Sequence, residues 1–99
     1  MTFKLSFSPE ADADMSLLEN DPSKKAELKA VRKALGYLQA NPRHTSLQTH
    51  PYFTQSGPNG EKLFEAYAQQ NRPGAYRVFW YYGPERGEII IATIMTHPK

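Results

Sequence analysis

The hydrophobic repeat of this chain changes from a helical period to a strand period after residue 60. Before that point, five apolar side chains recur at spacings of three and four: Leu28, Val31, Ala34, Leu35 and Leu38. Such a stripe is typical of an amphipathic helix that packs on a core. After residue 60 the apolar positions alternate, as they do in half-buried strands. The chain is therefore expected to pack helices against a sheet.

The first 40 residues contain a short strand and two helix starts. Residues 2–7 alternate between apolar and polar side chains, which predicts a strand. Ser8-Pro9 has the residue types of an N-cap and a first helical position, and the helix it begins should run to about Glu19. Asp21-Pro22 repeats this signal at the start of the helix that carries the apolar stripe, predicted over residues 22–40. Asn41-Pro42 ends it, because the residue before proline avoids the helical region.

Residues 41–60 have no clear period and are expected to be mainly loop. They contain three prolines, two histidines and the turn sequence Gly57-Pro58-Asn59-Gly60. A loop of about 20 residues is long for a compact domain. This segment is therefore either functional or contains a short element of regular structure.

Three strands are predicted in the remaining part of the chain. They begin at Lys62, at Tyr76 and at Ile89, and short turns rich in glycine and proline separate them. Together with the first strand they predict an α+β fold with the order β-α-α-β-β-β, in one domain over residues 1–99. We expect an antiparallel four-stranded sheet with both helices on one face. The other face should carry Glu65, Tyr67, Gln69, Arg77, Phe79 and Tyr81.

Composition excludes several classes of site. The chain has no cysteine, so it forms no disulfide and has no thiolate nucleophile. The three histidines, at 44, 50 and 97, have no recognised metal-ligand spacing, and we expect neither a metal nor a cofactor. No glycine-rich phosphate loop is present, and a small-molecule ligand is not expected. No apolar run is long enough for a signal peptide or a membrane span, so we expect a soluble cytoplasmic protein without membrane partners.

Arg77 is the most informative charged residue, because it lies within an aromatic strand. A buried guanidinium without a partner is very costly, so Arg77 must face solvent, a carboxylate or a ligand. One interpretation is a cross-strand ion pair with Glu65. The other is a phosphate clamp on the helix-free face of the sheet. His97, at the end of the last strand, could lie close to the same phosphate, and tyrosines on this face could stack on bases.

The order of several short motifs resembles the RelE/ParE toxin superfamily. The motifs run from Leu38-Gln39-Ala40-Asn41-Pro42 through Ser46-Leu47-Gln48-Thr49-His50, Leu63-Phe64-Glu65-Ala66 and Tyr76-Arg77-Val78-Phe79-Trp80 to Thr96-His97. The similarity covers about residues 26–97 and is greatest to the RelE-like branch. It implies a bacterial toxin that is held inactive by a cognate antitoxin.

The resemblance also implies an activity and a set of site residues. RelE-like toxins cut mRNA in the ribosomal A site without a metal, so the expected partners are an antitoxin and, for an active toxin, the ribosome and mRNA. Arg77 would neutralise the scissile phosphate and His97 would be the general acid, while Glu65 would be the base or would hold Arg77. RNA contacts are expected from Tyr67, Tyr81, His50 and Arg72.

Two departures from the family pattern leave alternatives to this function. Active relatives often have basic residues where this chain has Pro51 and Tyr67. The chain could therefore be a weakened endoribonuclease. It could also be a non-enzymatic binding protein of the same fold, such as an orphan member or a gyrase-directed ParE-like toxin.

Overall fold

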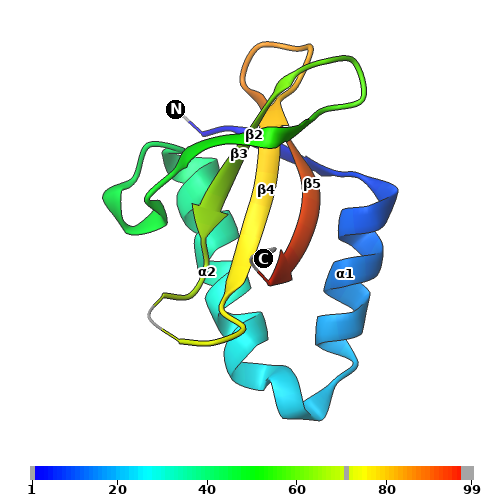
Figure 1. The fold of residues 1–99 in the computed structure, drawn as a ribbon, viewed down its shortest axis with the longest axis vertical. Helices are drawn as coiled ribbons and strands as arrows, with labels where there is room; N and C mark the ends of the chain where they lie inside the picture. Colours follow the sequence, from blue (N-terminus) through cyan, green and yellow to red (C-terminus); the bar gives the residue numbers. More distant parts are fainter. Residues whose placement is uncertain (1, 71, 97–99) are drawn as a thin grey trace.

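A computed structural model describes residues 2–70 and 72–96 (Figure 1). Its main elements are β1 (Lys4–Phe7), α1 (Pro9–Glu19), α2 (Lys25–Ala40), β2 (His50–Ser56), β3 (Lys62–Tyr67), β4 (Tyr76–Tyr82) and β5 (Glu88–Thr96). Short 3₁₀ turns, Pro22–Lys24 and Thr45–Leu47, precede α2 and β2. No helix in the described residues is long and apolar enough to cross a membrane.

The first helix begins where its capping residues predict, whereas the second capping signal starts a 3₁₀ turn just before α2. The Ser8 side chain accepts a hydrogen bond from the Ala11 backbone N–H at 3.0 Å, and Pro9 follows it as the first residue of α1. Asp21 accepts from the Ser23 backbone N–H at 2.9 Å and caps the first 3₁₀ turn. The predicted helix over residues 22–40 is thus a 3₁₀ turn that continues directly into α2.

The sheet has five strands in the order β1-β5-β4-β3-β2, so the predicted number of four is wrong. The additional strand is β2, which lies within the segment expected to be loop. It pairs with β3 at His50 and Pro51 and again at Ser56, with an irregularity between. Residues 53–56 of β2 are exposed and lack an apolar alternation, so no strand pattern marks them in the sequence. The sheet is also mixed, because β1 runs parallel to β5.

The two helices share one core with the sheet. Val31, Leu35 and Leu38 of α2 are buried as predicted, whereas Leu28 is only partly buried. They pack in one cluster with Trp80 of β4, the buried isoleucines of β5, and Ala11 and Leu18 of α1. Figure 1 shows α1 running alongside β5 and α2 lying behind the sheet.

α1 also protects the edge of β5 beyond the end of β1. The Ser8 hydroxyl donates to the Ala92 carbonyl at 2.6 Å, and the Ile94 backbone N–H donates to the Asp14 carboxylate at 2.9 Å. These backbone groups would otherwise lie on an unpaired strand edge. Asp14 therefore has a structural role, as the acceptor for a backbone N–H of β5.

The opposite face of the sheet carries Glu65, Tyr67, Arg77, Phe79 and Tyr81 as predicted, but much of it is buried. Gln69, the sixth predicted residue, lies beyond the end of β3. Leu63, Phe79 and Tyr81 form a second apolar cluster, and Tyr52 of β2 packs edge-on against Phe79 with ring centroids 5.1 Å apart. Because β2 was not expected, the sequence predicted an open face here. Glu65 is completely buried on this face.

Candidate functional site

Arg77 lies at the centre of a polar cluster on the helix-free face of the sheet. It pairs across the strands with Tyr67, and its guanidinium carbon lies 3.9 Å from the centre of the Tyr67 ring. This cation–π contact places the flat guanidinium over an aromatic surface. The Arg77 side chain is 12% exposed, so it is largely withdrawn from solvent but can still be reached at one edge.

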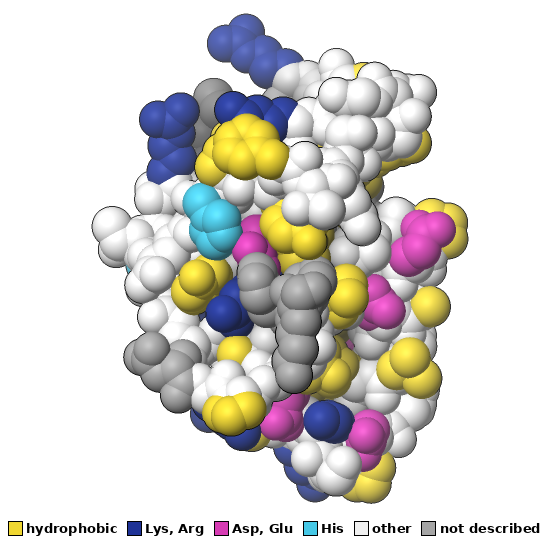
Figure 2. Space-filling view, in the orientation of Figure 1, with side chains coloured by type: hydrophobic (Ala, Val, Ile, Leu, Met, Phe, Trp, Pro, Cys, Tyr) yellow, Lys and Arg dark blue, Asp and Glu magenta, His cyan; other side chains and the backbone are white. Residues whose placement is uncertain are grey.

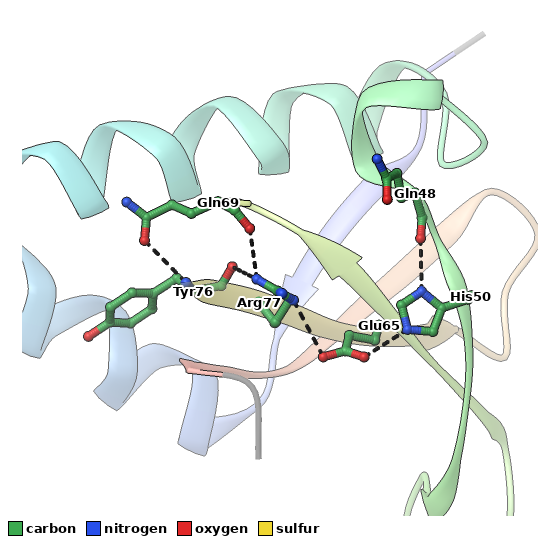
Figure 3. Close-up of polar contacts among 6 residues, drawn as sticks. All are labelled: Gln48, His50, Glu65, Gln69, Tyr76 and Arg77. Atoms are coloured by element: carbon green, nitrogen blue, oxygen red, sulfur yellow. Dashed lines mark hydrogen bonds and ion pairs between the residues drawn. The ribbon is translucent and has the colours of Figure 1, made fainter. Parts of the chain in front are cut away.

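Glu65 connects Arg77 with His50 (Figure 3). Its side chain is 1% exposed; Oε2 lies 3.7 Å from Arg77 Nε, and Oε1 lies 2.8 Å from His50 Nε2. The cross-strand ion pair anticipated from the sequence is therefore present. Neither carboxylate oxygen is open to a substrate, so Glu65 is placed to hold Arg77 rather than to remove a proton.

Backbone carbonyls fix the orientation of the guanidinium. Arg77 Nη1 donates to the carbonyl of Gln69 at 2.7 Å and to that of Tyr76 at 3.3 Å. The Gln69 side chain in turn accepts from the Tyr76 backbone N–H at 3.1 Å. Within the described part of the chain, Arg77 Nη2 has no hydrogen-bond acceptor. This nitrogen can therefore donate to an incoming oxyanion without breaking an existing contact.

His50 is held by acceptors at both ring nitrogens. Nδ1 lies 2.9 Å from the carbonyl oxygen of Gln48, and Nε2 faces Glu65. The Gln48 carbonyl and a Glu65 carboxylate can only accept hydrogen bonds. Both contacts are therefore hydrogen bonds only if a proton lies on each ring nitrogen, or on Nδ1 and the Glu65 carboxyl group. The His50 side chain is 42% exposed and lies edge-on to Tyr67, with ring centroids 5.7 Å apart. His50 is therefore a partly exposed hydrogen-bonding group at the rim of the site.

Two other predicted residues, Arg72 and Tyr81, do not join this cluster. Arg72 extends toward α2, where its Nη2 lies 3.7 Å from a carboxylate oxygen of Glu27. Tyr81 is 8% exposed, which leaves little of its ring for base stacking. Burial, with smaller contributions from nearby carboxylates, raises the pKa of Tyr81. His97 lies outside the described residues, so its proposed approach to Arg77 stays a prediction.

The sequence did not reveal how the site is held together. The direct pairing of His50 with Glu65 depends on β2, a strand that carries no clear signal in the sequence. Gln48 and Gln69 contribute through their backbone carbonyls, for which residue type gives no clue. Figure 2 shows histidine, basic and acidic side chains adjoining hydrophobic ones on the face that β2 crosses. The cluster thus combines a preorganised cation, a partly exposed histidine and an aromatic surface.

No family model matches the chain, and no curated protein matches it by sequence. Solved structures, however, have the same fold. A YoeB/ParE toxin from Agrobacterium tumefaciens is similar with a TM-score of 0.71 and 7% identity, over 96% of this chain and 99% of that one. RelE in the archaeal RelE–RelB complex of Pyrococcus horikoshii OT3 is similar with a TM-score of 0.63 and 17% identity, over 97% of this chain and 96% of that one. YafQ from E. coli is similar with a TM-score of 0.66 and 14% identity, over 96% of this chain and 93% of that one.

These similarities extend over nearly the whole chain and include the helices as well as the sheet. Their low sequence identity limits the conclusion to architecture, because one fold can have different functions. The chain has the fold of the RelE/ParE toxin superfamily.

Proposed function

We propose that this chain is the toxin of a type II toxin–antitoxin pair and acts as a ribosome-dependent mRNA endoribonuclease. The observation that carries the proposal is the placement of Arg77, a guanidinium fixed by Glu65 and two carbonyls with Nη2 left to bind a phosphate. An antitoxin partner follows from the similarity to RelE, which was solved in complex with RelB.

The proposed reaction is attack of a ribose 2′-hydroxyl on the adjacent phosphate. A new 2′-oxygen–phosphorus bond forms, the 5′-oxygen leaves, and the products are a 2′,3′-cyclic phosphate and a 5′-hydroxyl. Arg77 would stabilise the negative charge that develops on the phosphate oxygens. Tyr67 lies under the guanidinium and would limit how far it moves.

Two proton transfers accompany this attack. The resemblance assigns the acid that protonates the leaving 5′-oxygen to His97. We assign the removal of the 2′-hydroxyl proton to His50, whose side chain is the most exposed of the cluster formed with Glu65 and Arg77. As a base, His50 would act in its neutral form, with Nε2 turned from Glu65 toward the 2′-hydroxyl.

A second candidate function is a binding protein of this fold without nuclease activity. It is favoured by the low exposure of Arg77 and by its contact with Glu65, which a purely structural arginine would also show. A gyrase-directed toxin is one member of this class. Loss of DNA supercoiling activity in cells, with translation continuing, would identify it.

Induction of the chain alone in bacteria separates the two candidates. The nuclease proposal predicts that translation stops before growth does, and that Arg77→Ala removes the arrest. Arg32→Ala is the matched control, because Arg32 is an exposed arginine of α2 that pairs with the exposed Glu19. Translation arrest that is equally strong in the folded Arg77→Ala protein would exclude the proposed mechanism.

A further inference from the structure

A cavity of about 370 Å³ lies on the helix side of the sheet, where Phe64, Trp80 and Tyr82 meet the segment that follows α2. Phe64 and Trp80 pair across β3 and β4 and contribute to the helix-side core. Arg77 lies on the other face of the same sheet. The cavity is thus separate from the cluster of Arg77, Glu65 and His50.

Three aromatic rings form one wall of this cavity. Phe64 and Trp80 are stacked, with ring centroids 4.8 Å apart and an interplanar angle of 24°. Tyr82 stands edge-on to both, at 5.9 Å from Phe64 and 4.9 Å from Trp80. Tyr82 is 44% exposed, so part of its ring remains available to a ligand. A planar aromatic group is the ligand that such a wall stacks against most favourably.

Trp80, which lines this cavity, also has a buried donor without a partner in residues 2–70 and 72–96. The residue is 1% exposed, and its indole Nε1 is buried without a hydrogen-bond partner in the described residues. Nearly all buried donors in folded proteins are paired. A ligand with acceptor atoms that enters this cavity, with a small shift of the rings, would provide the missing partner.

The charge around the cavity selects for an anion. Arg43 lines it, and the Lys62 ammonium lies 5.7 Å from the centre of the Phe64 ring. None of the described residues that line it is acidic. By contrast, the groove beside Tyr81 on the other face is lined by Glu10. The ligand that suits both the rings and the charge is a flat heteroaromatic group that carries a negative group.

Backbone conformation at the rim fits a binding role. Gln48 has φ 45° and ψ 43°, and it is the only non-glycine residue with positive φ among residues 2–70 and 72–96. Such conformations are concentrated at binding and catalytic sites. Gln48 also contacts His50 through its carbonyl, so the rim of the cavity and the Arg77 cluster share this residue.

The geometry points to a nucleotide-binding site, with the base against Tyr82 and Phe64 and the phosphate at Arg43. The nucleotide could be free or part of an RNA chain, since both present the same base and phosphate. Binding here does not require the cleavage proposed at Arg77. The two proposals can therefore fail separately.

Trp80 is the single tryptophan of the chain, so its fluorescence reports directly on this cavity. We expect saturable quenching when AMP or UMP is added to the full chain, and at least fivefold weaker binding of adenosine or uridine, which lack the phosphate. An oligoribonucleotide that binds at least tenfold more tightly than the mononucleotides identifies RNA as the ligand. Equal affinities identify a free nucleotide.

Variants at the two ends of the ligand test its placement. Arg43→Ala should weaken binding by about fivefold or more and reduce its salt dependence. Tyr82→Ala should weaken it by a similar factor or more through loss of stacking. Arg32→Ala, on the exposed surface of α2, should bind like the unaltered chain. Circular dichroism verifies that each variant is folded. Absence of quenching at millimolar nucleotide and with the oligoribonucleotide, or equal binding by folded Arg43→Ala, would overturn the inference.

Discussion

His50 and Glu65 face each other directly across the β2–β3 pair, and a 2.8 Å contact joins His50 Nε2 to Glu65 Oε1. The other carboxylate oxygen lies 3.7 Å from Arg77 Nε. One buried carboxyl group therefore links the edge strand to the strand that carries the candidate phosphate-binding residue. Both the position of β2 and the direction of the guanidinium depend on it.

Removal of the Glu65 carboxylate should destabilise the fold. Glu65→Ala leaves the largely buried Arg77 without its counter-charge, and we expect the free energy of unfolding to fall by about 3–5 kcal/mol. Urea denaturation measures this change. Glu19→Ala is the matched control: its partner Arg32 is exposed, and the loss should stay below about 1 kcal/mol. Similar losses for the two variants would show that Glu65 contributes no more to the free energy of unfolding than an exposed carboxylate does.

Two leucines test the assignment of the core. Leu38 is completely buried and Leu17 is 72% exposed. Leu38→Ala should therefore lower the free energy of unfolding by about 2–5 kcal/mol, through lost burial and the cavity that remains. Leu17→Ala should change it by less than about 0.5 kcal/mol. Equal shifts in thermal unfolding would contradict the observed packing of α2.

Asp14 should stabilise the junction of α1 with β5. Asp14→Ala leaves the Ile94 backbone N–H without its acceptor, and a cost of about 1–3 kcal/mol is expected. Asp12→Ala, an exposed change in the first turn of the same helix, should cost less than about 1 kcal/mol. Amide hydrogen exchange at Ile94 should increase selectively in the Asp14 variant. Unchanged exchange would show that the hydrogen bond contributes nothing in solution.

The raised pKa of Tyr81 predicts that the fold loses stability in alkaline solution. Burial and the nearby carboxylates of Glu61, Glu88 and Glu10 raise its pKa above the ordinary value of 10.0. The folded chain therefore holds the phenol proton more tightly than the unfolded chain does. This contribution is fully present below pH 10 and is lost as the pH rises through the folded pKa. Tyr81→Phe should reduce the alkaline loss of unfolding free energy, and an identical pH profile would contradict it.

Elements with strong local signals were predicted well from the sequence. The stripe from Val31 to Leu38 marks α2, because burial of one helix face imposes a helical period. The aromatic run of β4 likewise marks a central strand. β2 left no such pattern, since its outer half packs against little and Pro51 lies near its start. An edge strand of this kind is defined by its partner, which the sequence alone does not show.

The candidate site was only partly predictable for the same reason. A charge within an aromatic strand needs a partner, so Arg77 could be singled out from its neighbours alone, and Glu65 was named as that partner. The contact between Glu65 and His50 depends on strand register across a loop of irregular sequence. Tyr81 likewise lies in an apolar cluster against which Tyr52 of β2 packs, so its burial could not be predicted without β2.

The central claim is that the Arg77 cluster cleaves RNA by attack of the 2′-hydroxyl. The most direct measurement is to incubate the purified chain with ribosomes that hold a defined mRNA, and to map the position and chemistry of the new RNA ends. We expect cuts that leave a 2′,3′-cyclic phosphate and a 5′-hydroxyl. Arg77→Ala should reduce the rate by about a hundredfold or more, and Arg32→Ala should retain it. Intact mRNA with the unaltered chain, or undiminished cutting by folded Arg77→Ala, would contradict the account.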